Sequence, residues 1–288
     1  VDSAGRCFVE FNDHEELTRI AAQCKKEGRT AGIIWEPIQG EGGIFVSTPE
    51  FVKTMNELQA RGELLIVADE VQTGFAGSKA DGGLICANLG VKPDILALAK
   101  SLTLGKSAAA AAFLRGSLAA TAFPPGVDGG TFSGMPYAMH CILAADDFWH
   151  KTDALDRLYK LGNDRKTEIG DAVAAQPNKH VKAVKGVGSM GAVQFNCTAS
   201  ALHYHHLFLR LTDPGVMHES FGPLPVGLKG IIQKLSGKDG SVMRMTSGLS
   251  PDQEDQKMLT KLISHLLTHP HYYPPCEVCK DGPCGAQA

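Results

Sequence analysis

Two side chains at the ends of apolar strands are placed so that they could share one small molecule. The run 64–68 is apolar throughout and is followed at once by Asp69, and the run 95–99 is followed by Lys100. Continuous apolar runs of this length are typical of parallel strands that are buried on both faces. Ligands of such sheets bind beyond the carboxyl ends of the strands. We therefore expect Asp69 and Lys100 to lie on the same edge of a sheet.

A carboxylate and an amine in this arrangement favour pyridoxal phosphate (PLP) as the shared molecule. A lysine that is shielded from water is a nucleophile that attacks an aldehyde and forms a carbon–nitrogen double bond. A carboxylate at the pyridine nitrogen keeps that nitrogen protonated, so that the ring accepts electrons. The pair predicts Lys100 as the covalent partner and Asp69 as the ring-nitrogen partner. Taken singly, Lys100 would be a surface lysine and Asp69 a loop cap.

The same stretch leaves a phosphate-loop nucleotide site as an alternative. Asp69-Glu70 after an apolar strand resembles a magnesium-holding strand, and Gly105-Lys106-Ser107 resembles half of a phosphate loop. The full pattern Gly-x-x-x-x-Gly-Lys-Ser/Thr requires glycine at position 100, which is lysine. The order is also reversed, because the phosphate loop normally precedes the aspartate strand. We therefore favour PLP.

The charge and hydropathy patterns indicate a soluble protein that binds neither nucleic acid nor a membrane. The 288 residues include 28 Lys and Arg against 31 Asp and Glu, which gives a net charge of −3. Apolar runs stay far below the roughly 18 residues that a membrane span needs. Mitochondrion, plastid and cytoplasm all fit. The chain begins at Val1 without a signal-peptide pattern, so we expect an incomplete or processed N-terminus.

The eight cysteines are typical of a reducing compartment rather than of a disulfide framework. Five are scattered singly: Cys7, Cys24, Cys86, Cys141 and Cys197. The others lie in a tail rich in Pro and Gly: Cys276, Cys279 and Cys284. These three could bind zinc together with His269 or His271. Because no second Cys-x-x-Cys pair is present, we favour a disordered tail over residues 271–288 and no metal.

The order of expected elements predicts two domains. Residues 1–150 alternate helices and strands, which is typical of an α/β domain with a parallel sheet. Its expected elements are a helix from Asp13 to Gly28, a strand at 31–35, a Gly-rich loop at 38–43, a helix from Thr48-Pro49 to Gly62, strands at 64–68 and 95–99, and an Ala-rich run at 108–113. Residues 151–270 read as a smaller α+β domain. Its expected elements are helices to about 175, at about 200–210 and from Pro251 to about 267 (capped by Ser250), with strands near 181–184, 191–195 and 242–245.

Several motifs together resemble the class III aminotransferases, a family of PLP-dependent enzymes. They are Glu36-Pro37-Ile38-Gln39-Gly40-Glu41-Gly42-Gly43, Asp69-Glu70-Val71-Gln72-Thr73-Gly74-Phe75, the surroundings of Lys100, and Gly130-Thr131-Phe132-Ser133-Gly134-Met135-Pro136. Three further segments are similar to the acetylornithine/ornithine branch: 11–13, 48–51 and 242–244. The resemblance implies the fold type I of PLP-dependent transferases, aspartate aminotransferase-like. That fold is a parallel-rich sheet with helices on both faces and a smaller C-terminal α+β domain.

The resemblance also implies a role for each matching residue around the cofactor. Lys100 would bind PLP covalently and Asp69 would contact its ring nitrogen. Val71 would pack on the ring face, and Gln72 would lie near the phenolic oxygen. Thr131 matches a residue that reaches the cofactor phosphate of a neighbouring subunit, which implies a homodimer.

Two matching residues imply how substrate is held. Arg244 matches an arginine that clamps the substrate α-carboxylate, a task suited to a planar bidentate donor. Glu41 matches a carboxylate that pairs with this arginine and tunes which end of the substrate binds. Without the resemblance, Arg244 would be read as a salt bridge at a strand end.

The chain departs from the family pattern at three places: Ala76-Gly77-Ser78-Lys79, the segment 103–108, and Met135 in place of an asparagine. An N-terminal portion that carries a phosphate-binding turn and a stacked aromatic residue in the family is absent. The implied activity is transfer of an amino group from an acetylornithine- or ornithine-like donor to 2-oxoglutarate, giving a semialdehyde and glutamate in arginine metabolism. The alternatives are a catalytically impaired remnant, a 4-aminobutyrate aminotransferase and an aminomutase.

Overall fold

The computed structural model describes residues 7–122, 129–211, 217–218, 222–223, 232–236, 241–246 and 253–270. The chain forms two compact units. Unit 1 comprises Val1–Ile38 and Val46–Asp153, and unit 2 comprises Gln39–Phe45 and Ala154–Ala288. The segment Gln39–Phe45, which the sequence assigned to the first domain, thus groups with the second. None of the described helices is both long and apolar enough to cross a membrane.

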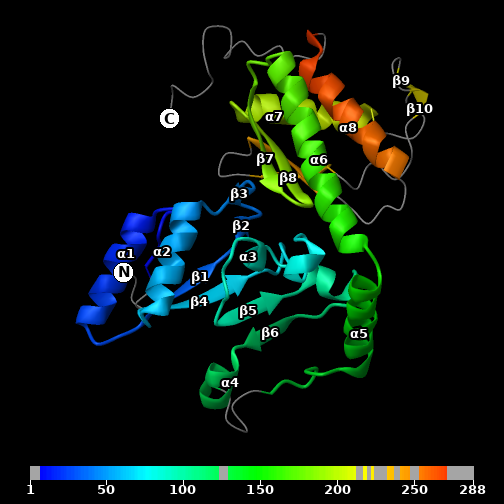
Figure 1. Cartoon of the computed structure of the whole chain (residues 1–288). Coiled ribbons are helices and arrows are strands. Elements are labelled where there is room, and N and C mark those ends of the chain that lie inside the picture. The colour runs from blue at the N-terminus through cyan, green and yellow to red at the C-terminus, as the bar shows by residue number, and fades with distance from the viewer. Residues whose placement is uncertain are drawn as a thin grey trace. The chain divides into compact units, whose positions relative to one another are not determined.

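Unit 1 is built on a four-stranded sheet with the strand order β1-β4-β5-β6 (Figure 1). The first three strands are parallel: β1 (Ala31–Trp35), β4 (Leu64–Asp69) and β5 (Ile95–Leu98). The fourth, β6 (Ala111–Leu114), is antiparallel to β5. The expected continuation of the β-α-β pattern is wrong here, because only the short 3₁₀ turn η2 (Lys100–Thr103) precedes β6 and a parallel strand needs a crossover helix.

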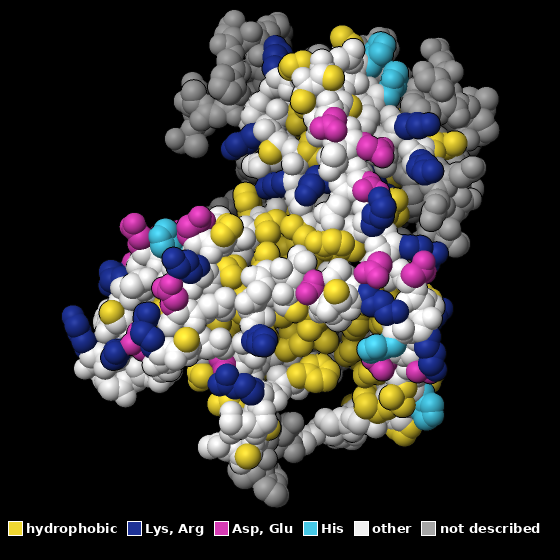
Figure 2. Space-filling model, in the orientation of Figure 1, with side chains coloured by type: hydrophobic (Ala, Val, Ile, Leu, Met, Phe, Trp, Pro, Cys, Tyr) yellow, Lys and Arg dark blue, Asp and Glu magenta, His cyan; other side chains and the backbone are white. Residues whose placement is uncertain are grey.

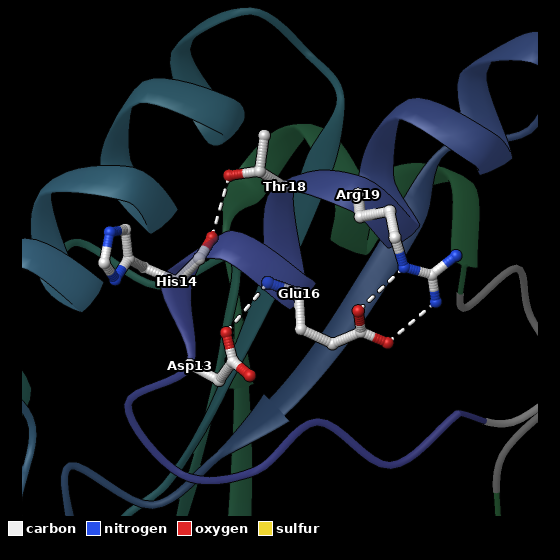
Figure 3. Close-up of polar contacts among 5 residues, drawn as sticks. All are labelled: Asp13, His14, Glu16, Thr18 and Arg19. Carbon is white, nitrogen blue, oxygen red and sulfur yellow. Dashed lines mark hydrogen bonds and ion pairs between the residues drawn. The ribbon is translucent and has the colours of Figure 1, made fainter.

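Two helices cover one face of this sheet, and both start at the predicted caps. α1 (His14–Lys26) begins after Asp13, whose Oδ1 accepts the N–H of Glu16 at 2.9 Å (Figure 3). α2 (Pro49–Ala60) begins after Thr48, whose hydroxyl accepts the N–H of Phe51 at 3.3 Å. The residues that make this core are Leu17, Ala21, Ala31, Trp35, Phe51, Val52, Met55, Leu58, Leu64, Ile66 and Ala68.

The opposite face of the sheet follows from the two-residue alternation of the strands. In β4, Leu64, Ile66 and Ala68 are buried against the helices, whereas Leu65, Val67 and Asp69 are more accessible. Asp69 therefore points to the face that is turned away from α1 and α2.

Shorter elements complete unit 1. They are η1 (Lys79–Asp81), α3 (Ile85–Asn88), α4 (Gly116–Ala122) and α5 (Pro136–Lys151). The predicted Gly-rich loop is instead a hairpin formed by β2 (Ile38–Gln39) and β3 (Phe45–Val46), because the glycines at its tip allow the chain to reverse. Phe75, which follows β4, stacks on Trp149 of α5 with ring centroids 5.2 Å apart.

Unit 2 is a four-stranded antiparallel sheet with the order β11-β12-β8-β7 (Figure 1). Its strands are β7 (Val181–Val187), β8 (Met190–Phe195), β11 (Ile232–Ser236) and β12 (Val242–Thr246). Its helices are α6 (Ala154–Ala175), α7 (Thr198–Leu211) and α8 (Gln253–Thr268). A second, two-stranded sheet joins β9 (Met217–His218) to β10 (Gly222–Pro223). β11 was not predicted, and Ser250 and the tail 271–288 lie outside the described residues.

The helices of unit 2 share a core with one face of its sheet. Val193 and Phe195 of β8 and Met243 and Met245 of β12 point to this face. They pack against helix residues that include Ile169, Tyr204, Phe208, Leu259, Leu262, Ile263 and Leu266. The residues that alternate with them in sequence, such as Ala192 and Arg244, therefore point to the other face of the sheet.

A close approach of two backbones fixes α6 on this sheet. A Cβ atom added at Gly162 of α6 would lie 1.8 Å from the carbonyl oxygen of Gly188, in the turn between β7 and β8. Glycine is the one residue that this contact tolerates without movement of the backbone. The position of α6 therefore depends on Gly162.

Candidate active site

The ends of β4 and β5 bring Asp69 and Lys100 to the same edge of the unit 1 sheet. Asp69 pairs in register with Ala97, and the N–H of Glu70 donates to the carbonyl of Ala97 at 3.0 Å. Lys100 follows β5 as the first residue of η2 and is exposed. A carboxylate and an amine thus follow adjacent parallel strands.

The Asp69 carboxylate is half-buried and oriented by the backbone that follows it. Its Oδ1 accepts the N–H of Val71 at 3.1 Å. Val71 and Gln72 are also half-buried and form part of the turn between Asp69 and Gly74. Residues beyond a parallel strand are well placed to line a ligand site.

Glu70 has a structural role that sequence reasoning missed. Its side chain is fully buried and accepts three hydrogen bonds, from the Thr73 hydroxyl at 3.0 Å and the N–H groups of Ile85 and Cys86 at 3.1 and 2.7 Å. The carboxylate therefore ties the turn after β4 to the start of α3. Burial, with the negative charge of Glu70 beside it, raises the pKa of the Cys86 thiol.

Backbone strain gathers beyond the same two strands. Five described residues other than glycine have positive φ values, and three of them follow these strands: Phe75, Lys100 and Leu104, with φ values of 69°, 46° and 51°. A left-handed conformation is costly for such residues and is frequent at functional sites. A Cβ atom at Gly74 would lie 2.8 Å from the carbonyl oxygen of Glu70, so this turn also requires glycine.

The chemistry of these groups fits PLP. The cofactor needs an amine for its aldehyde and a carboxylate for its ring nitrogen, and this edge offers one of each. Within the described residues, no group of three or more His, Cys, Asp or Glu side chains is placed to hold a metal ion.

Thr131 lies on an exposed surface of unit 1 and precedes α5. Its neighbours include large apolar side chains with high exposure: 79% for Phe132, 63% for Tyr137 and 64% for Leu143. Figure 2 shows hydrophobic side chains gathered at the lower end of α5. Exposed apolar patches of this kind mark protein–protein contacts.

Arg244 and Glu41 meet within unit 2. Arg244 lies on β12, on the face turned away from the helices, and is 4% exposed. Its Nη1 donates to Oε1 of Glu41, at the tip of the β2–β3 hairpin, at 2.9 Å. Its Nε is buried and has no hydrogen-bond partner in the part of the chain that is described. The guanidinium is therefore only partly satisfied.

Lys185 lies on the same face and was missed by sequence reasoning. Its ammonium lies 3.6 Å from the centre of the Phe45 ring and donates to Gln194 Oε1 at 3.1 Å. Burial lowers the pKa of Lys185 to about 8, and the charge of Lys182 adds to the shift. The predicted strand ended at Val184, whereas β7 continues to Val187. Extending the alternation by one residue would have found Lys185.

The sequence of this chain is similar to a known protein family and to several characterised relatives. Residues 7–262 match the family model described as aminotransferase class-III. The mitochondrial ornithine aminotransferase of Arabidopsis thaliana is 30% identical over 214 residues, which are 74% of this chain and 44% of that protein. The acetylornithine aminotransferase of Neisseria meningitidis (serogroup A) is 29% identical over 265 residues, which are 92% of this chain and 59% of that protein.

A solved structure agrees with these relatives. The crystal structure of acetylornithine aminotransferase from Elizabethkingia anophelis has a TM-score of 0.71 and 28% identity, over 90% of this chain and 59% of that chain. This chain thus spans about half the length of the relatives that it matches. The predicted family and fold class are confirmed, and PLP is the cofactor of that family. The chain belongs to the class III aminotransferases.

Proposed function

We propose that this chain is part of a PLP-dependent aminotransferase in which Lys100 binds the cofactor covalently and Asp69 holds the proton on its ring nitrogen. The observation that carries this proposal is the parallel pairing of β4 with β5. The carboxylate of Asp69 ends β4, and the amine of Lys100 follows β5 at the same edge of the sheet. Membership of the family supports the same assignment.

Each residue at this edge has a task that follows from its chemistry. PLP, when bound, supplies an electron sink for the substrate carbon that bears the amino group. The Lys100 amine moves a proton at that carbon, and positioned acid–base catalysis contributes about 10²–10⁴-fold in rate. When PLP is bound, Val71 would pack on the ring face and Gln72 would lie near the phenolic oxygen.

The proposed substrates are an acetylornithine- or ornithine-like amino donor and 2-oxoglutarate, which yield a semialdehyde and glutamate. Arg244 holds the substrate carboxylate, because a guanidinium offers two parallel N–H donors to it. The contact between Arg244 and Glu41 supports this role, since a carboxylate already occupies part of the guanidinium. Release of Glu41 would free Arg244 for the acid substrate.

We further propose that the active form is a homodimer in which Thr131 contributes to the cofactor phosphate site of the neighbouring subunit. The exposed apolar side chains of Phe132, Tyr137 and Leu143 support an interface at this surface.

Borohydride reduction in the presence of PLP tests the cofactor site. We expect a yellow protein and, after reduction, one cofactor mass on the peptide that contains Lys100. Lys100→Ala should lose the label. Lys106→Ala is the matched control, since Lys106 is an exposed lysine just after η2, and it should keep the label. Label on any other lysine would refute the assignment, and its absence would favour a non-catalytic member of the fold.

A further inference from the structure

Two cations stand in one row across the unit 2 sheet. Ala192 of β8 pairs with Lys185 of β7 on one side and with Arg244 of β12 on the other. Residues that pair in register point to the same face, here the face away from the helices. Two strand spacings separate the backbones of the two cations, about 10 Å. The residue between them is a small alanine, so neither side chain is screened from the other by a larger one.

Of these two cations, only Arg244 has a carboxylate partner among the described ion pairs. Arg244 contacts Glu41 through Nη1, and its Nε stays buried without a hydrogen-bond partner in the described residues. Lys185 forms no ion pair within the described part of the chain; its contacts are the Phe45 ring and the Gln194 amide. A half-buried ammonium and a buried guanidinium side by side favour an anion with two charges.

We propose that Lys185 is the second cation of a site for a dicarboxylic acid, with one carboxylate on Arg244 in place of Glu41 and the other on Lys185. The carboxyl carbons of an extended five-carbon diacid lie about 5 Å apart. Each ion pair spans up to about 4 Å. A diacid of this length therefore suits two cations whose backbones lie about 10 Å apart on one face of a sheet. Binding of a diacid here is argued from the unit 2 sheet alone. That the bound diacid acts as the amino acceptor rests on the proposed function.

The hairpin tip shows how the site accepts such a molecule. Glu41 already places one carboxylate on Arg244, and its side chain is 64% exposed, so a diacid from solvent can reach the same guanidinium. Phe45 covers the Lys185 ammonium and shields it from water. An ion pair that is shielded in this way is stronger than one on an open surface.

The charge of Lys185 makes the affinity for a diacid depend on pH. The charge that acts on it is Lys182 of its own strand. The surrounding elements also carry Glu41 at the hairpin tip, Arg244 on β12, and Lys166 of α6, which donates to the Gly186 carbonyl. Because burial lowers the pKa of Lys185 to about 8, the protonated form is present below pH 8. An anion binds that form, so the affinity should be full below pH 8 and fall as the pH rises through 8.

Calorimetric titration of the full chain with glutarate and with pentanoate, a monoacid of the same length, tests the proposal. At pH 7 the chain should prefer glutarate, and Lys185→Gln should weaken glutarate about tenfold while changing pentanoate less than about twofold. Lys185→Arg should keep the preference and remove its decline above pH 8. Lys182→Gln is the matched control, because Lys182 is an exposed lysine on the same strand.

Three outcomes would overturn the proposal. They are no binding of glutarate by either the parent chain or Glu41→Gln, equal affinities for glutarate and pentanoate, or a glutarate preference that survives Lys185→Gln. Neither ligand needs Lys100 or PLP. Failure of the cofactor label on Lys100 therefore leaves this test intact, and failure of this test leaves the label intact.

Discussion

The two sheets of this chain carry their candidate functional groups in different ways. In unit 1, Asp69 ends β4 and Lys100 follows β5, so the order of parallel strands alone sets their positions. In unit 2, Arg244 and Lys185 lie within strands and reach one face through alternation and register. The position of a group at a strand end is set by the order of the strands. The position of a group within a strand is set by the register of the sheet, and by how the sheet packs on its helices.

The largest effect that we expect from this difference concerns Gly162. Gly162→Ala should lower the free energy of unfolding of unit 2 by about 3 kcal/mol, because the added Cβ lies 1.8 Å from a backbone oxygen and overpacking of this kind is costly. Gly170→Ala on the same helix meets nothing within 4 Å. It should stabilise the protein by about 0.5–1 kcal/mol. Urea unfolding of both variants is the measurement, and equal behaviour would show that the β7–β8 turn yields easily.

The second expected effect is a change in acid binding at the unit 2 sheet that leaves the cofactor label at the unit 1 sheet unchanged. Arg244→Ala should raise the KM for 2-oxoglutarate about tenfold, because a carboxylate loses a bidentate partner. The borohydride label on Lys100 should persist, since that residue belongs to the other sheet. Steady-state kinetics and peptide mass analysis read the two effects. An unchanged KM would remove Arg244 from acid binding, and loss of the label would show that the two sheets do not act separately.

The smallest expected effect is a pH dependence of unit 2 through His180. This side chain is buried beside the Ser200 hydroxyl, at 3.2 Å from its Nδ1. Burial lowers its pKa below 6.5, and the charges of Lys179 and His203 act in the same direction. The unfolded chain therefore binds a proton first, so stability should be lost as the pH falls below about 6.5. The free energies of unfolding at pH 7.5 and 5.5 should differ by about 1 kcal/mol at most. His180→Gln should abolish this contribution. A difference that stays unchanged in this variant would exclude His180 as its source.

The strand ends of unit 1 are the part of the site that the sequence predicted best. An apolar run that stops at a charged residue is a local signal, and β4 and β5 appear where the runs at 64–68 and 95–99 predicted them. The caps Asp13 and Thr48 are local signals too, because a side chain bonds to an N–H three residues away. Such features need no knowledge of the distant chain.

The features that were missed depend on contacts between distant residues. The direction of β6 follows from its partner β5, and the role of Glu70 follows from N–H groups at positions 85 and 86. Lys185 becomes notable only once register pairs it, through Ala192, with Arg244. No local pattern of residue types specifies a register between strands that are far apart in sequence.

The grouping of Gln39–Phe45 with residues from Ala154 onward makes unit 2 discontinuous in sequence. A fragment that starts at Ala154 would lack Glu41 and Phe45. Its buried Arg244 guanidinium would be deprived of the carboxylate that it now contacts, which destabilises a buried charge. A fusion that links residues 39–45 to the segment that begins at Ala154, rather than a single cut at Asp153, is therefore the way to study unit 2 alone.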